Sequence, residues 1–288
     1  MPTAEVVAAG ITHHGEGAVW WPGSAAWPTG HLRIVDAYAG DLVDVFDDGS
    51  LARTHVGGFA GCFRPRVGGG AVVGVDRGIA LLDADGTLHP ASTLLPEDVR
   101  VNDGACDPDG NFWLGSMAWD ARTGAGTLHR LDDAGDISLQ VQDATIANGL
   151  GWSPDGTTAY WNDTPTQTVW AFDYAWDAGL VNRRPFVEID DADGSPDGLT
   201  VDRTGAVWVA TWGGSAVRRY DPTGRLDTVV EIGARQVSSC TIGGADLDRL
   251  YVTTSRENLD DGDDPLAGSV FALDLGESLG LAALPYAG

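Results

Sequence analysis

The feature that most limits the fold of this chain is a short pattern that occurs three times. Each copy begins with Asn or Asp followed by Gly, with Asp103 between the two in the first copy, continues through a short apolar run and a polar turn, and ends in an aromatic strand. The copies run over 102–113, 148–160 and 197–208, so their first residues lie 46 and 49 residues apart. A strand–turn–strand unit that repeats at roughly 40–50 residues is typical of a β-propeller.

Short β-type runs alternate with Gly, Asp and Pro turns along the whole chain, and no long amphipathic helix is evident. In such turns an Asp or Ser side chain accepts a backbone hydrogen bond, Pro fixes φ and Gly takes positive φ, as hairpin connections require. We therefore expect one all-β domain over residues 1–288, a six-bladed β-propeller with a metal site in its central channel. The predicted blades are 15–55 (with an insertion at 21–30), 58–95, 104–141, 148–188, 197–232 and 238–275, and segment 4–8 is expected to complete the last blade.

The charge balance restricts the partners of this protein. The chain has 42 acidic residues, 17 basic residues, all of them Arg, and a net charge of -25. Phosphate backbones and anionic membrane surfaces would repel it, so we expect neither nucleic-acid nor membrane partners. A well-solvated surface, shaped by genome composition or a saline cytoplasm, is the simplest explanation of the acidity.

The sequence also bears on the compartment. Its first residues lack a basic region followed by an apolar segment, and no apolar run approaches the ~18 residues that a membrane span needs. Cys62, Cys106 and Cys240 are widely spaced and form no C-x-x-C pair, which is typical of reduced, buried thiols. We expect a cytoplasmic protein, and both monomer and homodimer remain open.

Four polar residues recur in phase with the repeat. Asn102, Asn148 and Asp197 open their copies, and Glu16 precedes Asn102 by 86 residues, which is two repeats of 43. Inner strands of a propeller converge on the central channel, so these side chains should meet at one mouth of it. Two carboxylates and two amide carbonyls offer oxygen ligands, which suit Ca²⁺, Mg²⁺ or Mn²⁺. The alternative is that each Asn-Gly or Asp-Gly pair merely makes a turn.

The longest motifs resemble those of the senescence marker protein/gluconolactonase/luciferin-regenerating enzyme family of six-bladed propellers. The stretch 100–117 (RVNDGACDPDGNFWLGSM) is close to the family's R-x-N-D-G-x-x-D-P-x-G-R-x-W-x-G-T-M, and Glu16-Gly-Ala-Val-Trp20 is similar to G-E-G-P-x-W with Ala18 in place of Pro. Further matching segments are 148–156, 195–202, 210–214, 250–256 and 265–271. The resemblance covers nearly the whole chain.

The resemblance implies hydrolysis of a small sugar-acid lactone, such as a glucono-, xylono- or arabinono-lactone, at one divalent metal ion. Glu16, Asn148 and Asp197 would hold the metal, and Asp197 would also accept the proton of the attacking water. Ca²⁺ is the ion we expect, although Zn²⁺, Mn²⁺, Mg²⁺ and Fe²⁺ also bind such sites.

By the same resemblance Arg100 and Asn102 bind substrate. A guanidinium offers a planar fork of donors to sugar hydroxyls or to a developing oxyanion. Trp119 lies where relatives carry substrate-contacting loops, and we expect it to contact substrate too. His13 and His14 either line the pocket or are ordinary loop residues.

Two other functions compete with the lactonase. One is a non-catalytic propeller that binds metal or senses a ligand, which would keep the metal ligands but would not need Arg100. The other is an esterase or phosphotriesterase of similar fold. Neither the lactone used nor the metal bound in the cell follows from the sequence.

Overall fold

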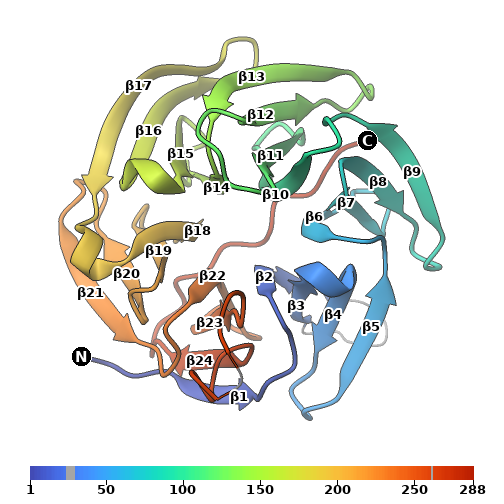
Figure 1. Cartoon of the computed structure of the whole chain (residues 1–288). Helices are drawn as coiled ribbons and strands as arrows, with labels where there is room; N and C mark the ends of the chain where they lie inside the picture. The colour runs from blue at the N-terminus through green and yellow to red at the C-terminus, as the bar shows by residue number, and fades with distance from the viewer. Residues whose placement is uncertain (24–29, 261) are drawn as a thin grey trace.

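Six four-stranded antiparallel sheets follow one another around a central axis (Figure 1). The computed structural model describes residues 1–23, 30–260 and 262–288. The architecture is an all-β six-bladed β-propeller, as the repeat predicts. From the axis outward, the first blade is β2 (Gly15–Trp21), β3 (His31–Asp36), β4 (Asp41–Val45) and β5 (Leu51–His55), and the second is β6 (Ala60–Pro65), β7 (Ala71–Val75), β8 (Gly78–Leu82) and β9 (Leu88–Thr93). The third is β10 (Val99–Cys106), β11 (Phe112–Ala118), β12 (Gly126–Leu131) and β13 (Ile137–Ala144), and the fourth is β14 (Ala147–Trp152), β15 (Thr158–Asp163), β16 (Thr168–Ala175) and β17 (Gly179–Glu188). The fifth is β18 (Ser195–Val201), β19 (Val207–Trp212), β20 (Ala216–Tyr220) and β21 (Leu226–Glu231), and the sixth is β22 (Val237–Gly243), β23 (Arg249–Thr254), β24 (Val270–Asp274) and β1 (Glu5–Ala8).

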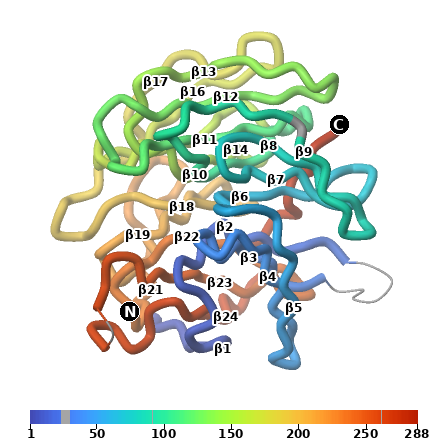
Figure 2. Tube along the Cα trace, turned by 45° about the vertical axis from the view of Figure 1, so that its right-hand side comes forward, coloured from blue at the N-terminus to red at the C-terminus, as the bar shows by residue number. Residues whose placement is uncertain are grey.

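The ring is closed by a strand from the other end of the chain. β1 pairs antiparallel with β24, with Glu5 opposite Ala272 and Val6 opposite Phe271. The last blade therefore joins strands from both ends of the sequence, as predicted for segment 4–8. Radial closure of this kind leaves only short, protected sheet edges. Figure 2 shows the six inner strands stacked along the middle of the molecule.

Helical structure is minor. Three short 3₁₀ turns occur in the described residues, namely η1 (Ala37–Ala39), η2 (Thr164–Thr166) and η3 (Asp191–Asp193). No helix in that part of the chain is long and apolar enough to cross a membrane. Most of the predicted insertion at 21–30 falls on residues 24–29, which lie outside the described residues.

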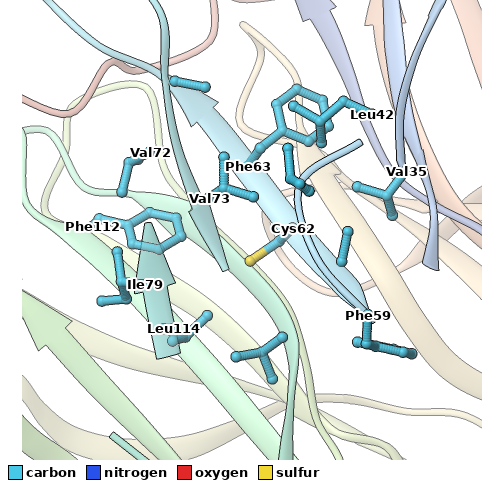
Figure 3. Packing of buried hydrophobic residues seen from close by; sticks show 14 of the residues in the cluster. Val35, Leu42, Phe59, Cys62, Phe63, Val72, Val73, Ile79, Phe112 and Leu114 are labelled. Carbon is cyan, nitrogen blue, oxygen red and sulfur yellow. The ribbon is translucent and has the colours of Figure 1, made fainter. Parts of the chain in front are cut away.

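Hydrophobic side chains fill the spaces between neighbouring blades. In Figure 3, Val35 of the first blade meets Phe63 and Val73 of the second, with Phe112 and Leu114 of the third on the other side. Second strands such as β7 and β11 are apolar on both faces because each face packs against a different neighbour. Removal of this apolar surface from water is the main stabilising term of the ring.

The repeated Asp and Trp of the sequence pattern are joined by a buried hydrogen bond. Trp113 Nε1 donates to Asp107 at 2.8 Å, and Trp208 Nε1 donates to Asp202 at 2.9 Å. The other oxygen of each carboxylate accepts from backbone N–H groups two and four residues later in the turn. Each Asp therefore fixes the hairpin turn and the ring of the second strand at the same time.

The segment after β24 crosses the far end of the central channel, as the red trace in Figure 1 shows. The backbone N–H of Leu279 donates to Leu247 of the sixth blade at 3.0 Å, and that of Tyr286 donates to Pro65 of the second blade at 2.8 Å. A cavity of about 120 Å³ lies between residues 281–284 and the later residues of the inner strands. The C-terminal segment thus forms the floor of the channel.

Replacing Asp202 by Asn should lower the free energy of unfolding by about 1–3 kcal/mol, because the buried bonds to Trp208 and Arg219 lose their charged acceptor. Burial raises the pKa of Asp202, but hydrogen bonds from Thr204, Trp208 and Arg219 outweigh it and leave that pKa below its ordinary 3.8. A carboxyl of this kind contributes stability above pH 3.8 that is lost on further acidification. Urea denaturation should therefore show the largest difference from wild type near neutral pH.

Asp221→Asn is the matched control, since Asp221 accepts the same turn hydrogen bonds but bonds no tryptophan and is more exposed. Asp221→Asn should lower the free energy of unfolding by less than half as much as Asp202→Asn does. Equal losses in the two variants would contradict a special role for the Asp–Trp bond.

Candidate functional site

Every inner strand carries a β-bulge close to its beginning. At this point the pairing with the second strand of the blade shifts, so that extra residues on the inner strand are left unpaired. The shifts lie between Glu16 and Val19, Ala60 and Cys62, Val101 and Gly104, Ala147 and Leu150, Pro196 and Leu199, and Val237 and Ser239. All six bulges face the same end of the channel, which we call the mouth.

The predicted ligand residues occupy these bulges. Asn102, Asn148 and Asp197 are bulge residues of the third, fourth and fifth blades, and Glu16 is the last paired residue before the bulge of the first. The prediction that they converge on the mouth agrees with the structure. The Asn-Gly and Asp-Gly pairs are therefore parts of bulged strands, and the simple turn alternative is wrong for them.

The glycines of these pairs are required by close approach of the next strand. A Cβ on Gly149 would lie 2.5 Å from the carbonyl oxygen of Asp197, and one on Gly198 would lie 2.8 Å from Ser239 Oγ. Inner strands can come this near the axis only where the side chain is a hydrogen. The glycine thus makes room for the neighbouring blade while its partner points to the axis.

The loops that lead into the inner strands are held by carboxylates at the ends of the second strands. Asp36 accepts from the backbone N–H groups of His13 and His14, at 3.0 and 3.3 Å. Asp76 accepts from that of Phe59 at 2.9 Å, and Asp163 bonds the two residues before β14 in the same way. A recurring carboxylate acceptor therefore fixes the start of the inner strand in three blades.

Hydrogen bonds orient the side chains of Arg100, Asn102 and Asn148 at the mouth. Arg100 Nη1 donates to Asn102 Oδ1 at 2.7 Å, and Asn102 Nδ2 donates to the carbonyl of Ala147 at 3.0 Å. Asn148 Nδ2 donates to Thr164 Oγ1 at 3.1 Å, so its amide is oriented by a neighbouring loop. Arg100 and Asn102, both predicted to bind substrate, are thus one hydrogen-bonded pair.

A cavity of about 10 Å³, room for one water or one small ion, lies among these residues. Glu16, Asn102, Asp103 and Asn148 contribute to its lining. Beside them, Oδ1 of the buried Asp197 has no hydrogen-bond partner in the part of the chain that the structure describes. A buried carboxylate oxygen without a donor calls for a cation or a water.

The carboxyl groups of the site oppose one another's ionisation. Burial raises the pKa of Glu16 well above its usual range, and the charges of Asp197 and Asp103 raise it further. Burial and the charge of Asp103 likewise raise the pKa of Asp197, while a hydrogen bond from Asn148 acts in the opposite direction. Burial also raises the pKa of Asp103 itself. A bound positive charge would relieve this arrangement.

The donor set is mixed. Among the described residues, no group of three or more His, Cys, Asp or Glu side chains is placed to hold a metal ion. Glu16 and Asp197 provide two carboxylates, and the amide oxygens of Asn102 and Asn148 are further oxygen donors at the same cavity. Oxygen donors of this kind, with an unpartnered Asp197 oxygen and a cavity of ion size, fit a hard divalent cation.

An aromatic wall stands beside the predicted metal ligands. The guanidinium carbon of Arg100 lies 4.4 Å from the ring centre of Phe59 and 5.4 Å from that of Trp119. Trp119 is 49% exposed, so its indole can contact a ligand at the mouth. Tyr38 packs edge-on against Phe59 with ring centres 5.4 Å apart. The neighbouring Asp120 is exposed and pairs with Arg122.

Sequence reasoning missed Tyr38, Phe59 and Glu257 and left His14 open. His14 lines the small cavity, and burial lowers its pKa to about 4, so the ring is neutral at pH 7. Tyr38 donates a hydrogen bond to the Glu257 carboxylate across the first and sixth blades. The one signal available in the sequence was position. Glu257 closely follows a predicted second strand, at the end of that strand that lies near the mouth.

The cysteines are not part of this chemistry. Cys62, Cys106 and Cys240 are buried and free of disulfides, as expected. Burial raises the pKa of each thiol, and that of Cys240 reaches about 12, so none is a thiolate at neutral pH.

Comparison with known proteins places this fold and site in a family. The model of the SMP-30/gluconolactonase/LRE-like region matches residues 14–256. The chain is 36% identical over 233 residues to 6-deoxy-6-sulfogluconolactonase of Pseudomonas putida, covering 78% of this chain and 80% of that protein. It is also 36% identical over 227 residues to L-arabinolactonase of Azospirillum brasilense, covering 75% and 74%. Among solved structures, a calcium-binding regucalcin from Agrobacterium tumefaciens superposes with a TM-score of 0.88 at 27% identity, over 99% of both chains. The resemblance read from the motifs is confirmed, and this protein belongs to the SMP-30/gluconolactonase/LRE-like family.

Proposed function

We propose that this protein is a divalent-metal-dependent hydrolase of a small neutral sugar-acid lactone. The observation that carries the proposal is the buried, unpartnered Oδ1 of Asp197 beside the ion-sized cavity that Glu16 and Asn148 line. Relatives named as lactonases support the reaction class, and a relative described as calcium-binding supports a metal.

The residues that would hold the metal are Glu16, Asn148 and Asp197. Their oxygen donors favour Ca²⁺, with Mg²⁺, Mn²⁺, Zn²⁺ and Fe²⁺ as other occupants to be tested. When bound, a divalent ion polarises the lactone carbonyl and lowers the pKa of a coordinated water.

Hydrolysis requires one proton to be removed and one to be delivered. A water oxygen forms a bond to the carbonyl carbon, and its proton passes to the Asp197 carboxylate. The bond between the carbonyl carbon and the ring oxygen then breaks, and the ring oxygen takes a proton and becomes a hydroxyl group. Asp197 would release the accepted proton to that ring oxygen, so that it acts first as a general base and then as a general acid.

Substrate orientation falls to the wall beside the ligands. Arg100 presents guanidinium N–H groups to the lactone, while its bond to Asn102 fixes the fork in place. Trp119 offers an apolar face against which a sugar ring can pack. Together these groups would hold the carbonyl near Asp197.

Asp197→Asn should lower the turnover of a lactone panel (glucono-, galactono-, xylono- and arabinono-lactone) by about 100- to 10,000-fold, which is the rate enhancement that a general base usually contributes. The assay is acid release after correction for spontaneous opening, on metal-stripped protein titrated with each ion. Asp246→Asn, which removes an exposed carboxylate, is the matched control and should retain full activity.

Near-normal turnover by Asp197→Asn would overturn the assigned role of this residue. Tight metal binding by the wild type without turnover on any lactone or ester would instead favour a metal-binding or ligand-sensing propeller. Turnover of aryl esters or phosphotriesters in place of lactones would favour the related hydrolase classes.

Asp197→Asn should also stabilise the metal-stripped protein, because it removes a buried carboxyl group whose ionisation is opposed by burial and by Asp103, and whose charge raises the pKa of Glu16. Added Ca²⁺ should reverse the order of stability of the two proteins, since Ca²⁺ at 100 times its dissociation constant would stabilise the wild type by about 2.7 kcal/mol and the variant by much less. Thermal melts with and without Ca²⁺ measure both effects. A metal-stripped variant that melts below the wild type would contradict the repulsion inferred at this site.

A further inference from the structure

The mouth carries a carboxylate that the proposed reaction does not use. Glu257 follows β23, and its side chain accepts a hydrogen bond from the Tyr38 hydroxyl on η1 of the first blade. Its charge acts on Arg100, Asp197 and His14, which places it among the residues of the site. Tyr38 is 39% exposed and Glu257 is half-buried, so a ligand can reach the pair.

The backbone beneath Glu257 is fixed by buried hydrogen bonds. Its N–H donates to Ser255 Oγ at 2.9 Å, and Ser255 Oγ also lies 2.7 Å from His14 Nδ1. Gln236 Nε2 donates to the carbonyls of Ser255 and Glu257, at 3.1 and 2.9 Å. A loop held in this way presents its carboxylate at a set position, as a recognition group requires.

Tyr38 links this carboxylate to the substrate wall. Its ring packs edge-on against Phe59 and lies 6.5 Å from the ring of Trp119, and both of those rings flank Arg100. The rim of the mouth, defined as Tyr38, Phe59, Trp119 and Glu257, therefore runs continuously from the sixth blade to the third. Arg100 packs against two of these rings, and the charge of Glu257 acts on it.

We propose that the Tyr38–Glu257 pair is the specificity determinant of this site, accepting hydrogen bonds from the hydroxyl groups of a neutral lactone and disfavouring lactones that carry an anionic group. A carboxylate and a phenol oxygen are acceptors for hydroxyl donors. The same carboxylate repels a phosphate or sulfonate. This inference rests on the proposed lactonase function and names its substrate class.

The inference separates this chain from one of its relatives. The Pseudomonas putida protein is named for a lactone that bears a sulfonate, yet it shares 36% of its residues with this chain. Overall likeness at that level does not decide whether an anionic lactone is accepted. On this proposal the charge at the rim decides whether an anionic lactone is accepted, and in this chain that charge is negative.

The test compares gluconolactone with phosphogluconolactone on the wild type and on Glu257→Gln, both with saturating metal. The wild type should prefer the neutral lactone, and Glu257→Gln should lower the ratio of the two kcat/KM values by about 10-fold or more, because a charged acceptor is lost and a repulsion is relieved. Tyr38→Phe should raise KM for the neutral lactone and leave kcat nearly unchanged. Glu277→Gln, which removes an exposed carboxylate elsewhere, is the matched control and should leave the ratio unchanged.

Calorimetric binding of gluconolactam, a neutral analogue that is not a lactone, provides a readout independent of turnover. Glu257→Gln should weaken this binding by a similar factor while melting at the temperature of the wild type. Wild-type protein that opens no lactone would defeat the proposed function, and lactam binding would still decide the role of the pair. An unchanged substrate ratio and unchanged lactam binding in Glu257→Gln would overturn the inference.

Discussion

The convergence of six inner strands on one axis is the constraint on which the rest of this structure depends. Strands that meet so closely cannot all remain regular, and each of the six carries a bulge at the same level. The bulge turns one side chain toward the axis and requires a small residue beside it, as Gly149 and Gly198 show. The geometry that packs the blades is therefore the same geometry that gathers Asn102, Asn148 and Asp197 at the mouth.

That shared origin explains what the sequence reveals. Because the blades share one packing problem, their residues recur in phase, and the position of Glu16, Asn148 and Asp197 at the mouth could be predicted from spacing and motif alone. The bulge itself could not be predicted, since Asn-Gly and Asp-Gly serve turns equally well. Tyr38, Phe59 and Glu257 lie in connecting segments of different blades, where no repeated packing requirement leaves a periodic trace. Their place in the site follows only from the folded ring.

The cost of the site is visible in its electrostatics. Burial raises the pKa of three carboxyl groups, those of Glu16, Asp103 and Asp197, and the charge of Asp103 raises the pKa of the other two further, with only partial compensation from hydrogen bonds. The surrounding ring offsets this strain through the apolar contacts between blades and the closure by β1. Stability is thus concentrated in the blades, and the unfavourable charges are confined to the one place where a cation and a substrate would meet them.

The C-terminal segment gives the channel a direction. Because residues 281–284 lie across its far end, a molecule bound at the mouth has the rim as its way in and its way out. For a protein that opens a lactone there, the charge of the bound molecule changes during the reaction, since a neutral ring enters and an anionic acid leaves. The same negative rim that tolerates the first would drive the second outward, so the closed floor and the charged entrance together would favour product release over its retention.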